Sequence, residues 1–360
     1  MPHSQLKAML AITKGSLRSI FRNPSAVVFN LLFPLIFIVV FGFIGGGSYG
    51  VDVAIDKSSD LNNPVYESMK KIPALRIDNN LKEKDVRSEL SKGNLDGLIN
   101  IQKAGDTYEV HVTTSSASVQ RGEILKYIIK DIIENQNKLS NKIDTNSIRL
   151  KEELVEGRKY RTIDFILPGQ LGFSLLSAGV FGTAFTFLSL RQTMVLKRFY
   201  ATPIKRIYIV VGEGLSRLIF SLFSAVIIVL IGHYLFGFTL INGFLTFINI
   251  LILSTLALFV FLGFGFVVSG IAKNENSVPA IANIITLPQF LLAGTFFPIN
   301  NFPSWLQPVS KALPLTYLNE ALRKVSFEGA SLGDVYMDIL ILLGWGVINY
   351  AIASKVFKWE

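Results

Sequence analysis

Runs of uncharged, apolar residues constrain this chain more than any other feature of its sequence. An α-helix rises 1.5 Å per residue, so about 20 apolar residues cross a hydrocarbon layer of about 30 Å. Several runs of this length occur in the 360 residues, of which 50% are hydrophobic. We therefore predict a polytopic α-helical membrane protein with six transmembrane helices. The predicted helices cover residues 24–45, 165–190, 215–238, 244–268, 278–297 and 334–356.

A long polar stretch separates the first two predicted helices. Residues 46–164 contain 19 Lys and Arg and 19 Asp and Glu, so they carry no net charge. Residues 51–56, 95–102 and 107–113 alternate as strands do, and residues 116–156 have a polar helical pattern. We therefore predict an α/β extracytoplasmic domain inserted between helices 1 and 2. Binding of a substrate or partner and simple capping of the helices both stay open as its role.

The net charge of +9 is concentrated in a few short segments. Residues 1–22 carry +4 and residues 191–217 carry +5. With the amino terminus in the cytoplasm, the inner segments total +10 and the outer segments −1, as the positive-inside rule requires. This predicts a multi-pass protein of the cytoplasmic (inner) membrane with both termini in the cytoplasm, and no nucleic acid as a partner. The first helix lacks a following small-residue cleavage site, so we predict that it is retained.

The segment before the first predicted membrane helix, residues 1–23, has an apolar stripe beside a row of cations. The stripe consists of Leu6, Met9, Leu10, Thr13, Leu17, Ile20 and Phe21, and the cations are Lys7, Lys14, Arg18 and Arg22. This pattern predicts a cytoplasmic interfacial helix whose cations lie near anionic lipid headgroups. The alternative is a basic flank that only sets the topology.

Residues that carry enzyme chemistry are scarce. The chain has no Cys and three His, which excludes a disulfide scaffold and a cysteine nucleophile and disfavours a zinc enzyme. It lacks the G-x-x-x-x-G-K-[ST] loop that binds phosphates. The predicted membrane helices contain few ionisable groups beyond Glu213, Arg217 and His233, whereas ion-coupled transporters place such groups at mid-membrane. Transport would therefore take its energy from a partner on the cytoplasmic face.

The cytoplasmic loop 191–214 is the best candidate for docking such a partner. Its residues 191–206 are basic, yet they include apolar side chains that would be unfavourable in water. A short helix ending near Thr202 and Pro203 would present these side chains to a groove on another protein. An interfacial helix that contacts only lipid is an equally good interpretation.

Small and polar residues inside the predicted helices indicate how the helices pack. One set recurs every four residues and would let another helix approach closely. It consists of Ser174, Ala178, Gly182 and Thr186. A second set comprises amide side chains that need partners within a membrane. These are Asn30, Asn283 and Gln289. Packing within one subunit and hydrogen bonds between helices are the favoured interpretations, and a dimer seam or the lining of a translocation pathway is the alternative.

Five short motifs, taken in order along the chain, are together specific. They are RNP (22–24), LPGQ (167–170), LKRFYATPI (196–204), LLAGTFFPINNFPSWL (291–306) and LPLTYLNEALR (313–323). In this order they resemble the membrane subunits of ABC-2-type ABC transporters, of the type with a large ectodomain between helices 1 and 2. The resemblance covers nearly the whole chain except residues 103–160. Many members of that family have Lys where this chain has Glu213.

The resemblance implies a non-catalytic permease subunit of an ATP-driven exporter. Two permeases, identical or different, would form the pathway within the membrane lipids, and two ABC ATPase subunits would hold the ATP and Mg²⁺, so this chain itself would hold no cofactor. The residues that couple to the ATPase would be Leu196, Lys197, Arg198, Phe199, Tyr200, Thr202 and Pro203. The alternative is a membrane-anchored binding or receptor-like surface protein without transport activity.

The resemblance also implies a re-entrant external hairpin over residues 291–306. In this hairpin Gly294 would allow a tight backbone turn, Phe297 would lie in the turn, and Pro298 would end the preceding helix.

Overall fold

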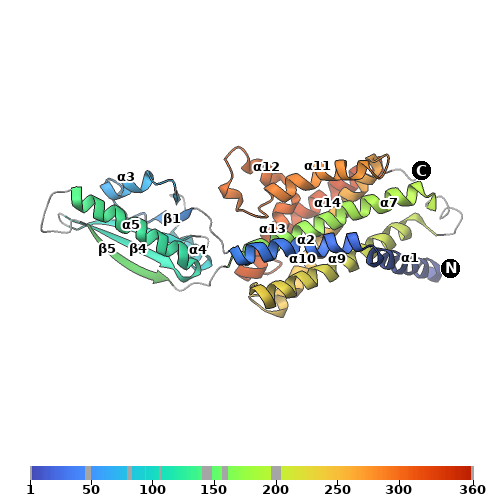
Figure 1. Cartoon of the computed structure of the whole chain (residues 1–360), viewed down its shortest axis with the longest axis horizontal. Coiled ribbons are helices and arrows are strands. Elements are labelled where there is room, and N and C mark those ends of the chain that lie inside the picture. Colours follow the sequence, from blue (N-terminus) through green and yellow to red (C-terminus); the bar gives the residue numbers. More distant parts are fainter. Residues whose placement is uncertain are drawn as a thin grey trace. The chain divides into compact units, whose positions relative to one another are not determined.

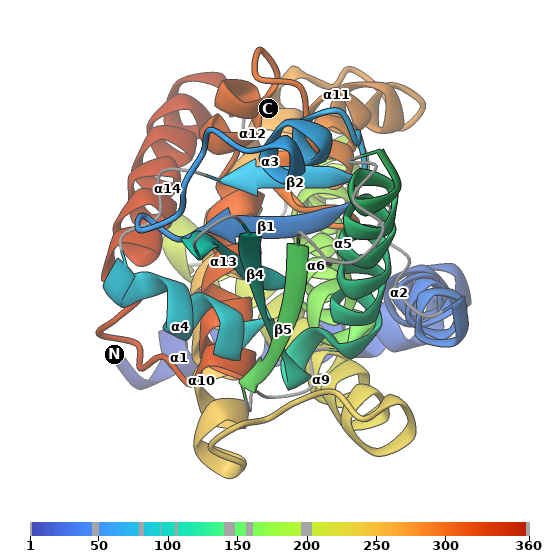
Figure 2. The same ribbon diagram turned by 90° about the vertical axis from the view of Figure 1, so that its left-hand side faces the viewer.

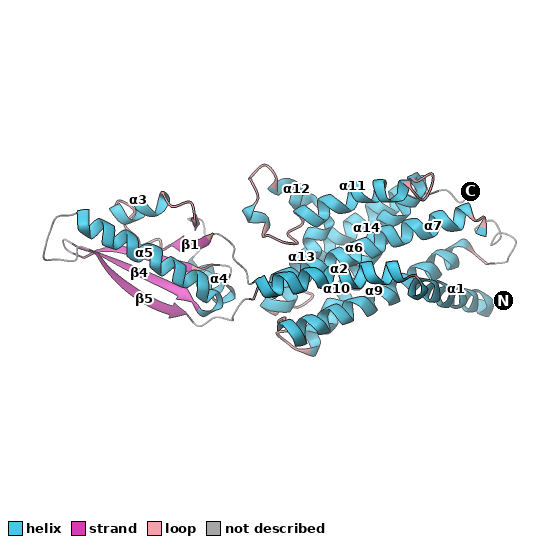
Figure 3. Ribbon diagram, in the orientation of Figure 1, coloured by secondary structure: helices cyan, strands magenta, loops and turns pink. Residues whose placement is uncertain are grey.

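The fold divides into two compact units, each of which is considered by itself. One unit comprises residues 1–45 and 162–360, and the other comprises residues 46–161. The structure is a computed structural model that describes residues 2–44, 50–78, 83–93, 95–104, 107–139, 148–155, 161–195 and 204–357. Among these residues every strand lies in the second unit (Figures 1 and 3), and the elements of the first unit are all helical.

The helices of the first unit have the following bounds: α1 Pro2–Arg22, α2 Pro24–Ile44, α6 Thr162–Ser177, the π-helical turn η2 Ala178–Gly182, α7 Thr183–Gln192, α9 Arg206–Phe236, α10 Phe244–Ile271, α11 Ser277–Leu292, η3 Ile299–Asn301, α12 Gln307–Ala312, α13 Pro314–Arg323, the π-helical turn η4 Lys324–Glu328 and α14 Tyr336–Val356.

Among the residues that the structure describes, four helical stretches are long and apolar enough to cross a membrane. They are Thr162–Gln192, Ile207–Phe236, Phe244–Ile271 and Tyr336–Val356. At the other two predicted spans the structure has shorter apolar stretches, Asn30–Phe41 and Ser277–Leu292. The count of six spans therefore stays a prediction.

Helix α9 begins nine residues before the predicted span at 215, so residues 206–214 of the predicted loop are helical. The backbone of Lys205 is extended, with φ −72° and ψ 139°, and the helical conformation starts directly after it.

Glycines at the crossing of η2 and α10 let the two backbones touch. A Cβ atom added to Gly265 would lie 2.5 Å from the carbonyl oxygen of Gly179 and 2.6 Å from Cβ of Thr183. Small residues at such a crossing allow van der Waals contact between helix backbones, which drives helix association where water is absent. The crossing is therefore part of the core that holds the first unit together.

Helix α13 was not anticipated from the sequence. Its residues Leu315, Leu318 and Leu322 are buried, and the helix packs against α6 and α14. Pro314 occupies its first turn, where the missing N–H costs no hydrogen bond. The spacing of these leucines by three and four residues, together with this proline, is the signal that could have predicted it.

The second unit is an α/β domain built on a five-stranded sheet with the order β2-β1-β3-β4-β5. The strands are β1 Val51–Ile55, β2 Leu75–Asp78, β3 Gly97–Ala104, β4 Thr107–Ser115 and β5 Ile148–Val155, and the helices are α3 Pro64–Lys70, α4 Glu83–Lys92, η1 Ser116–Ser118 and α5 Val119–Leu139. Strands β3 and β4 pair antiparallel, and the other neighbours pair in parallel. Figure 2 shows β5 beside β4 at the edge of the sheet.

The predicted helical region 116–156 is wrong over residues 148–155, which form β5. Ile148 and Leu150 pack into the core beneath α5, whereas Lys151 points to the other face and reaches Glu109 of β4. This alternation has the period of a strand, and pairing with β4 outweighs the helix propensity of the Lys and Glu residues. The buried face of α5 consists of Leu125, Ile129, Ile132 and Ile133.

Asp96 is a fully buried carboxylate in this second unit. The N–H of Asp52 donates to its Oδ2 at 2.9 Å, and Nη1 of Arg121 lies 3.5 Å from the same oxygen. Burial raises the pKa of Asp96 above its ordinary value of 3.8, more than the charge of Arg121 lowers it. The carboxylate thereby connects β1, the start of β3 and α5.

Replacement of Gly265 by Ala should destabilise the protein by about 1–3 kcal/mol, because the added methyl group overlaps the backbone of η2. Gly344→Ala in α14 is the matched control, since a Cβ there meets no atom within 4 Å. Thermal unfolding in detergent gives the midpoint of unfolding of each variant. Equal midpoints for the two variants would contradict the role given to this crossing.

Candidate functional site

The predicted coupling residues lie outside the described part of the chain, which resumes at residue 204. The structure shows the helices on either side, α7 ending at Gln192 and α9 beginning at Arg206. Nη2 of Arg191 donates to the carbonyl oxygen of Ala272 at 2.7 Å, at the carboxyl end of α10. The N–H of Lys205 donates to Oε1 of Gln5 in α1 at 3.1 Å. Both flanks of the segment 196–203 are thus attached to other helices.

Helix α1 packs on the first turns of α9 through polar groups. Thr13 Oγ1 donates to the carbonyl oxygen of Gly212 at 3.0 Å, and Ser16 Oγ donates to a carboxylate oxygen of Glu213. A Cβ added to Gly212 would lie 3.0 Å from the carbonyl oxygen of Met9, so glycine allows this close approach. Only 6% of Glu213 is exposed, and Ser16 is therefore an important partner for its carboxylate.

Arg217 lies one turn after Glu213 on α9 and connects this helix to α7. It is 9% exposed, and its Nη2 donates to Oγ1 of Thr186. The guanidinium occupies the space in which a side chain at position 182 would otherwise lie, so Gly182 makes room for it. The pairs Ser16–Glu213 and Arg217–Thr186 lie one turn apart on α9 and together form a polar link, named here the α1–α9–α7 link, between α1 and the two helices that flank residues 196–203.

Ser174 binds a backbone oxygen in α2 that a proline leaves without its helical donor. Pro34 has no N–H, so the carbonyl oxygen of Asn30 four residues earlier lacks its usual helical donor. Ser174 Oγ of α6 donates to that oxygen at 2.9 Å. The small-residue stripe thus packs within the subunit at Ser174, and Ala178 is buried in η2.

The amides of the second predicted set have different environments. Oε1 of Gln289 accepts from the N–H of Leu315 at 3.3 Å and so binds a free donor at the start of α13. Asn283 is half-buried on α11, next to the exposed Ile284. The polar side chain Asn319, which the sequence reasoning missed, donates from Nδ2 to the carbonyl oxygen of Ala293 at 2.9 Å.

The predicted hairpin turns at Gly294, whose φ of +69° is the left-handed conformation that favours glycine. Arg323 of α13, also missed, donates from Nη2 to the carbonyl oxygens of Gly294 and of Phe165 at the start of α6. Helix α11 ends at Leu292, six residues before Pro298, and Pro298 instead precedes η3. Phe297 is exposed.

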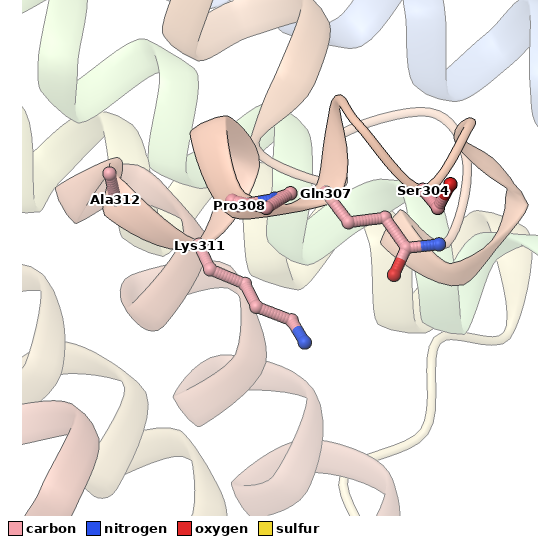
Figure 4. A pocket seen from close by; sticks show the side chains of 5 residues that line it. All are labelled: Ser304, Gln307, Pro308, Lys311 and Ala312. Atoms are coloured by element: carbon pink, nitrogen blue, oxygen red, sulfur yellow. The ribbon is translucent and has the colours of Figure 1, made fainter.

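An open hollow of about 460 Å³ lies beside α12. It is lined by Ser304, Gln307, Pro308, Lys311 and Ala312. Figure 4 shows the side chains of Gln307 and Lys311 extending from the helix, and this lining offers one cation but no carboxylate or imidazole that could act as a base. Among the residues that the structure describes, no three His, Asp or Glu side chains gather where they could hold a metal ion.

The family model described as "ABC-2 family transporter protein" matches residues 24–355, which is most of the chain.

This chain belongs to the ABC-2 transporter family.

Several curated proteins are similar to this ABC-2 family member. ABC transporter G family member 20 of Dictyostelium discoideum is 23% identical over 96% of this chain, which spans half of that protein. Linearmycin resistance permease protein LnrN of Bacillus subtilis is 21% identical over 98% of this chain and all of its own length. The probable multidrug ABC transporter permease YbhR of Escherichia coli is 22% identical over 54% of this chain and 52% of its own.

Family membership and the apolar helices together make this a helical membrane protein with an α/β region. Relatives named as permeases agree with a transport subunit and disfavour the receptor-like alternative.

Replacement of Ser16 by Ala in this ABC-2 protein should cost about 1–3 kcal/mol of stability, because the buried carboxylate of Glu213 loses its donor. Ser19→Ala, an exposed position on the same helix, should change stability by less than about 0.5 kcal/mol. A double-mutant cycle with Glu213→Ala, followed by thermal unfolding, isolates the pair. Additive effects of Ser16→Ala and Glu213→Ala would show that the two side chains do not interact.

Proposed function

We propose that this chain is the permease subunit of an ATP-driven exporter. Two permeases form the translocation pathway, and two separate ABC ATPase subunits that hold ATP and Mg²⁺ drive it. The observation that carries this proposal is the family match over residues 24–355. The lack of a phosphate-binding loop in the sequence is consistent with ATP hydrolysis in a partner chain.

The coupling element in this proposal is the segment 196–203. Its apolar and basic residues would seat in a groove of the ATPase. The α1–α9–α7 link and the contact of Arg191 with Ala272 support this assignment, because they attach both flanks of the segment to the helical unit. Motion imposed on the segment would then move α7, α9 and α1 together.

The proposed topology has six membrane spans, cytoplasmic termini in the cytoplasmic membrane, and the α/β domain on the outside. The charge distribution supports it, with +10 on the inner segments and −1 on the outer ones. The two shorter apolar stretches, in α2 and α11, supply the fifth and sixth spans of this arrangement.

The proposed cargo is a small organic compound that is moved outward. The support is the naming of two relatives, one for linearmycin resistance and one for probable multidrug transport. Gln289 and the small residues of the stripe belong to helix packing in this proposal. Asn283 is the amide best placed to face the pathway, since it is half-buried on α11.

The substitutions Leu196→Asp and Phe199→Asp should abolish export and release the ATPase during purification, because a buried charge would weaken an apolar contact. Asn276→Asp adds the same charge to the short segment between the predicted helices 244–268 and 278–297, and it should leave both properties unchanged. Co-purification of the ATPase with tagged permease, and ATP-driven uptake of cargo into inverted vesicles, measure the two properties. Full export by the Leu196 and Phe199 variants would overturn the coupling assignment.

A further inference from the structure

Strand β5, Ile148–Val155, forms an edge of the sheet in the second unit. In the described part of the domain it pairs only with β4, through eight register positions from Ile148 opposite Tyr108 to Val155 opposite Ser115. The side of the strand that faces away from β4 therefore carries backbone groups that no strand among the described residues binds. Such an edge is a template for pairing with another strand.

Side chains of β5 alternate between two charged surfaces. On the α5 side, Glu152 lies 3.2 Å from Nζ of Lys126. On the other side, Lys151 lies 2.8 Å from Glu109, and Glu153 accepts from Thr113 at 3.5 Å. The charges of both faces are thus held in place by neighbours within the sheet and α5.

Leu154 sets this edge apart, because 63% of it is exposed. Charged residues alone would protect an edge from unwanted pairing, and that is the non-functional interpretation of β5. A large aliphatic side chain near the end of the same strand works against such protection. It offers an apolar contact to a strand that pairs with β5.

We propose that β5 is an interface between two copies of this chain. The two β5 strands pair antiparallel about a two-fold axis that passes through Glu152. Lys151 of each copy then lies opposite Glu153 of the other copy. Leu150 of each copy likewise lies opposite Leu154 of the other. Opposite charges and apolar pairs directly across an antiparallel ladder each stabilise it.

This register is the one that the side chains favour. The two Glu152 carboxylates meet at the axis on the α5 side, where the Lys126 of each copy, which also binds Glu123, lies 3.2 Å from Glu152 and offsets part of their repulsion. Moving the axis to Lys151 would place two lysines opposite each other and Leu150 opposite Glu152. A register that places a residue on the α5 side of the sheet opposite a residue on the other side is excluded. Such a register differs by one residue, and a one-residue slip turns every side chain of the strand to the other face.

The partner is therefore a second copy of the same chain. A self-complementary strand needs its own sequence on the other side of the axis, as isologous interfaces do. The inference deepens the proposed function, on which it rests for the presence of two permeases in one transporter, and makes that pair identical.

Cross-linking can test the register directly, since the natural chain contains no Cys. In the proposed pairing the two Cα atoms at position 152 are about 4.5–5.5 Å apart, within the range that a disulfide spans. The matched control is Arg149→Cys on the same strand, whose two copies are separated by about 20 Å, six residues at 3.4 Å each. Full-length Glu152→Cys protein in membranes should form oxidised dimers on the order of tenfold faster than Arg149→Cys protein, because pairing raises the local thiol concentration.

Charge exchange gives a second readout. In the Glu152→Cys background, Lys151→Glu and Glu153→Lys should each reduce dimer formation several-fold, and the double exchange should restore it, because it recreates the same two opposite-charge pairs. Equal cross-linking at positions 149 and 152, or none at 152, would overturn the β5 pairing. Loss of pairing in a permease that still retains its ATPase refutes this inference alone, whereas cross-linked dimers that never bind an ATPase refute the proposed function alone.

Discussion

Unpaired backbone groups in a medium without water are the constraint on which the helical unit depends. Each proline, helix start or tight turn leaves a donor or acceptor that lipid cannot satisfy. The carbonyl oxygen of Asn30, freed by Pro34, is bound by Ser174. The N–H of Leu315 at the start of α13 is bound by Gln289. These polar side chains therefore stabilise irregular backbone, and they do so by joining helices that are distant in sequence.

The same constraint gives a physical role to the two ionisable residues of α9. A buried carboxylate and a buried guanidinium are tolerated because hydroxyl groups of α1 and α7 bind them. The resulting link joins α1 to α7 and α9, the two helices that adjoin the segment 196–203 in sequence. In the proposed exporter this makes the cytoplasmic end of the unit a single mechanical element, so that force on the coupling segment reaches α1 as well as α9.

Much of this architecture could be predicted from residue patterns, because hydrophobic run length and charge are local properties. The errors fall where contacts between residues distant in sequence, or elements too short for such a pattern, decide the structure. Residues 148–155 contain Lys and Glu at helix-compatible spacing, and only their pairing with β4 makes them a strand. The ten residues of α13 are too few to span a membrane, so a search for long runs passes over them. The role of Arg323 depends on carbonyl groups at Phe165 and Gly294, which sequence spacing cannot bring together.

The sequence by itself determined a helical membrane protein with an inserted α/β region and a resemblance to the ABC-2 family, since apolar length, charge asymmetry and motif order can be read along the chain. Tertiary structure alone decided which polar residues meet. Ser16 and Glu213 are 197 positions apart, and Ser174 and Asn30 are 144 apart. A hydrogen bond depends on distances of about 3 Å in space, and these follow from helix packing rather than from any local pattern.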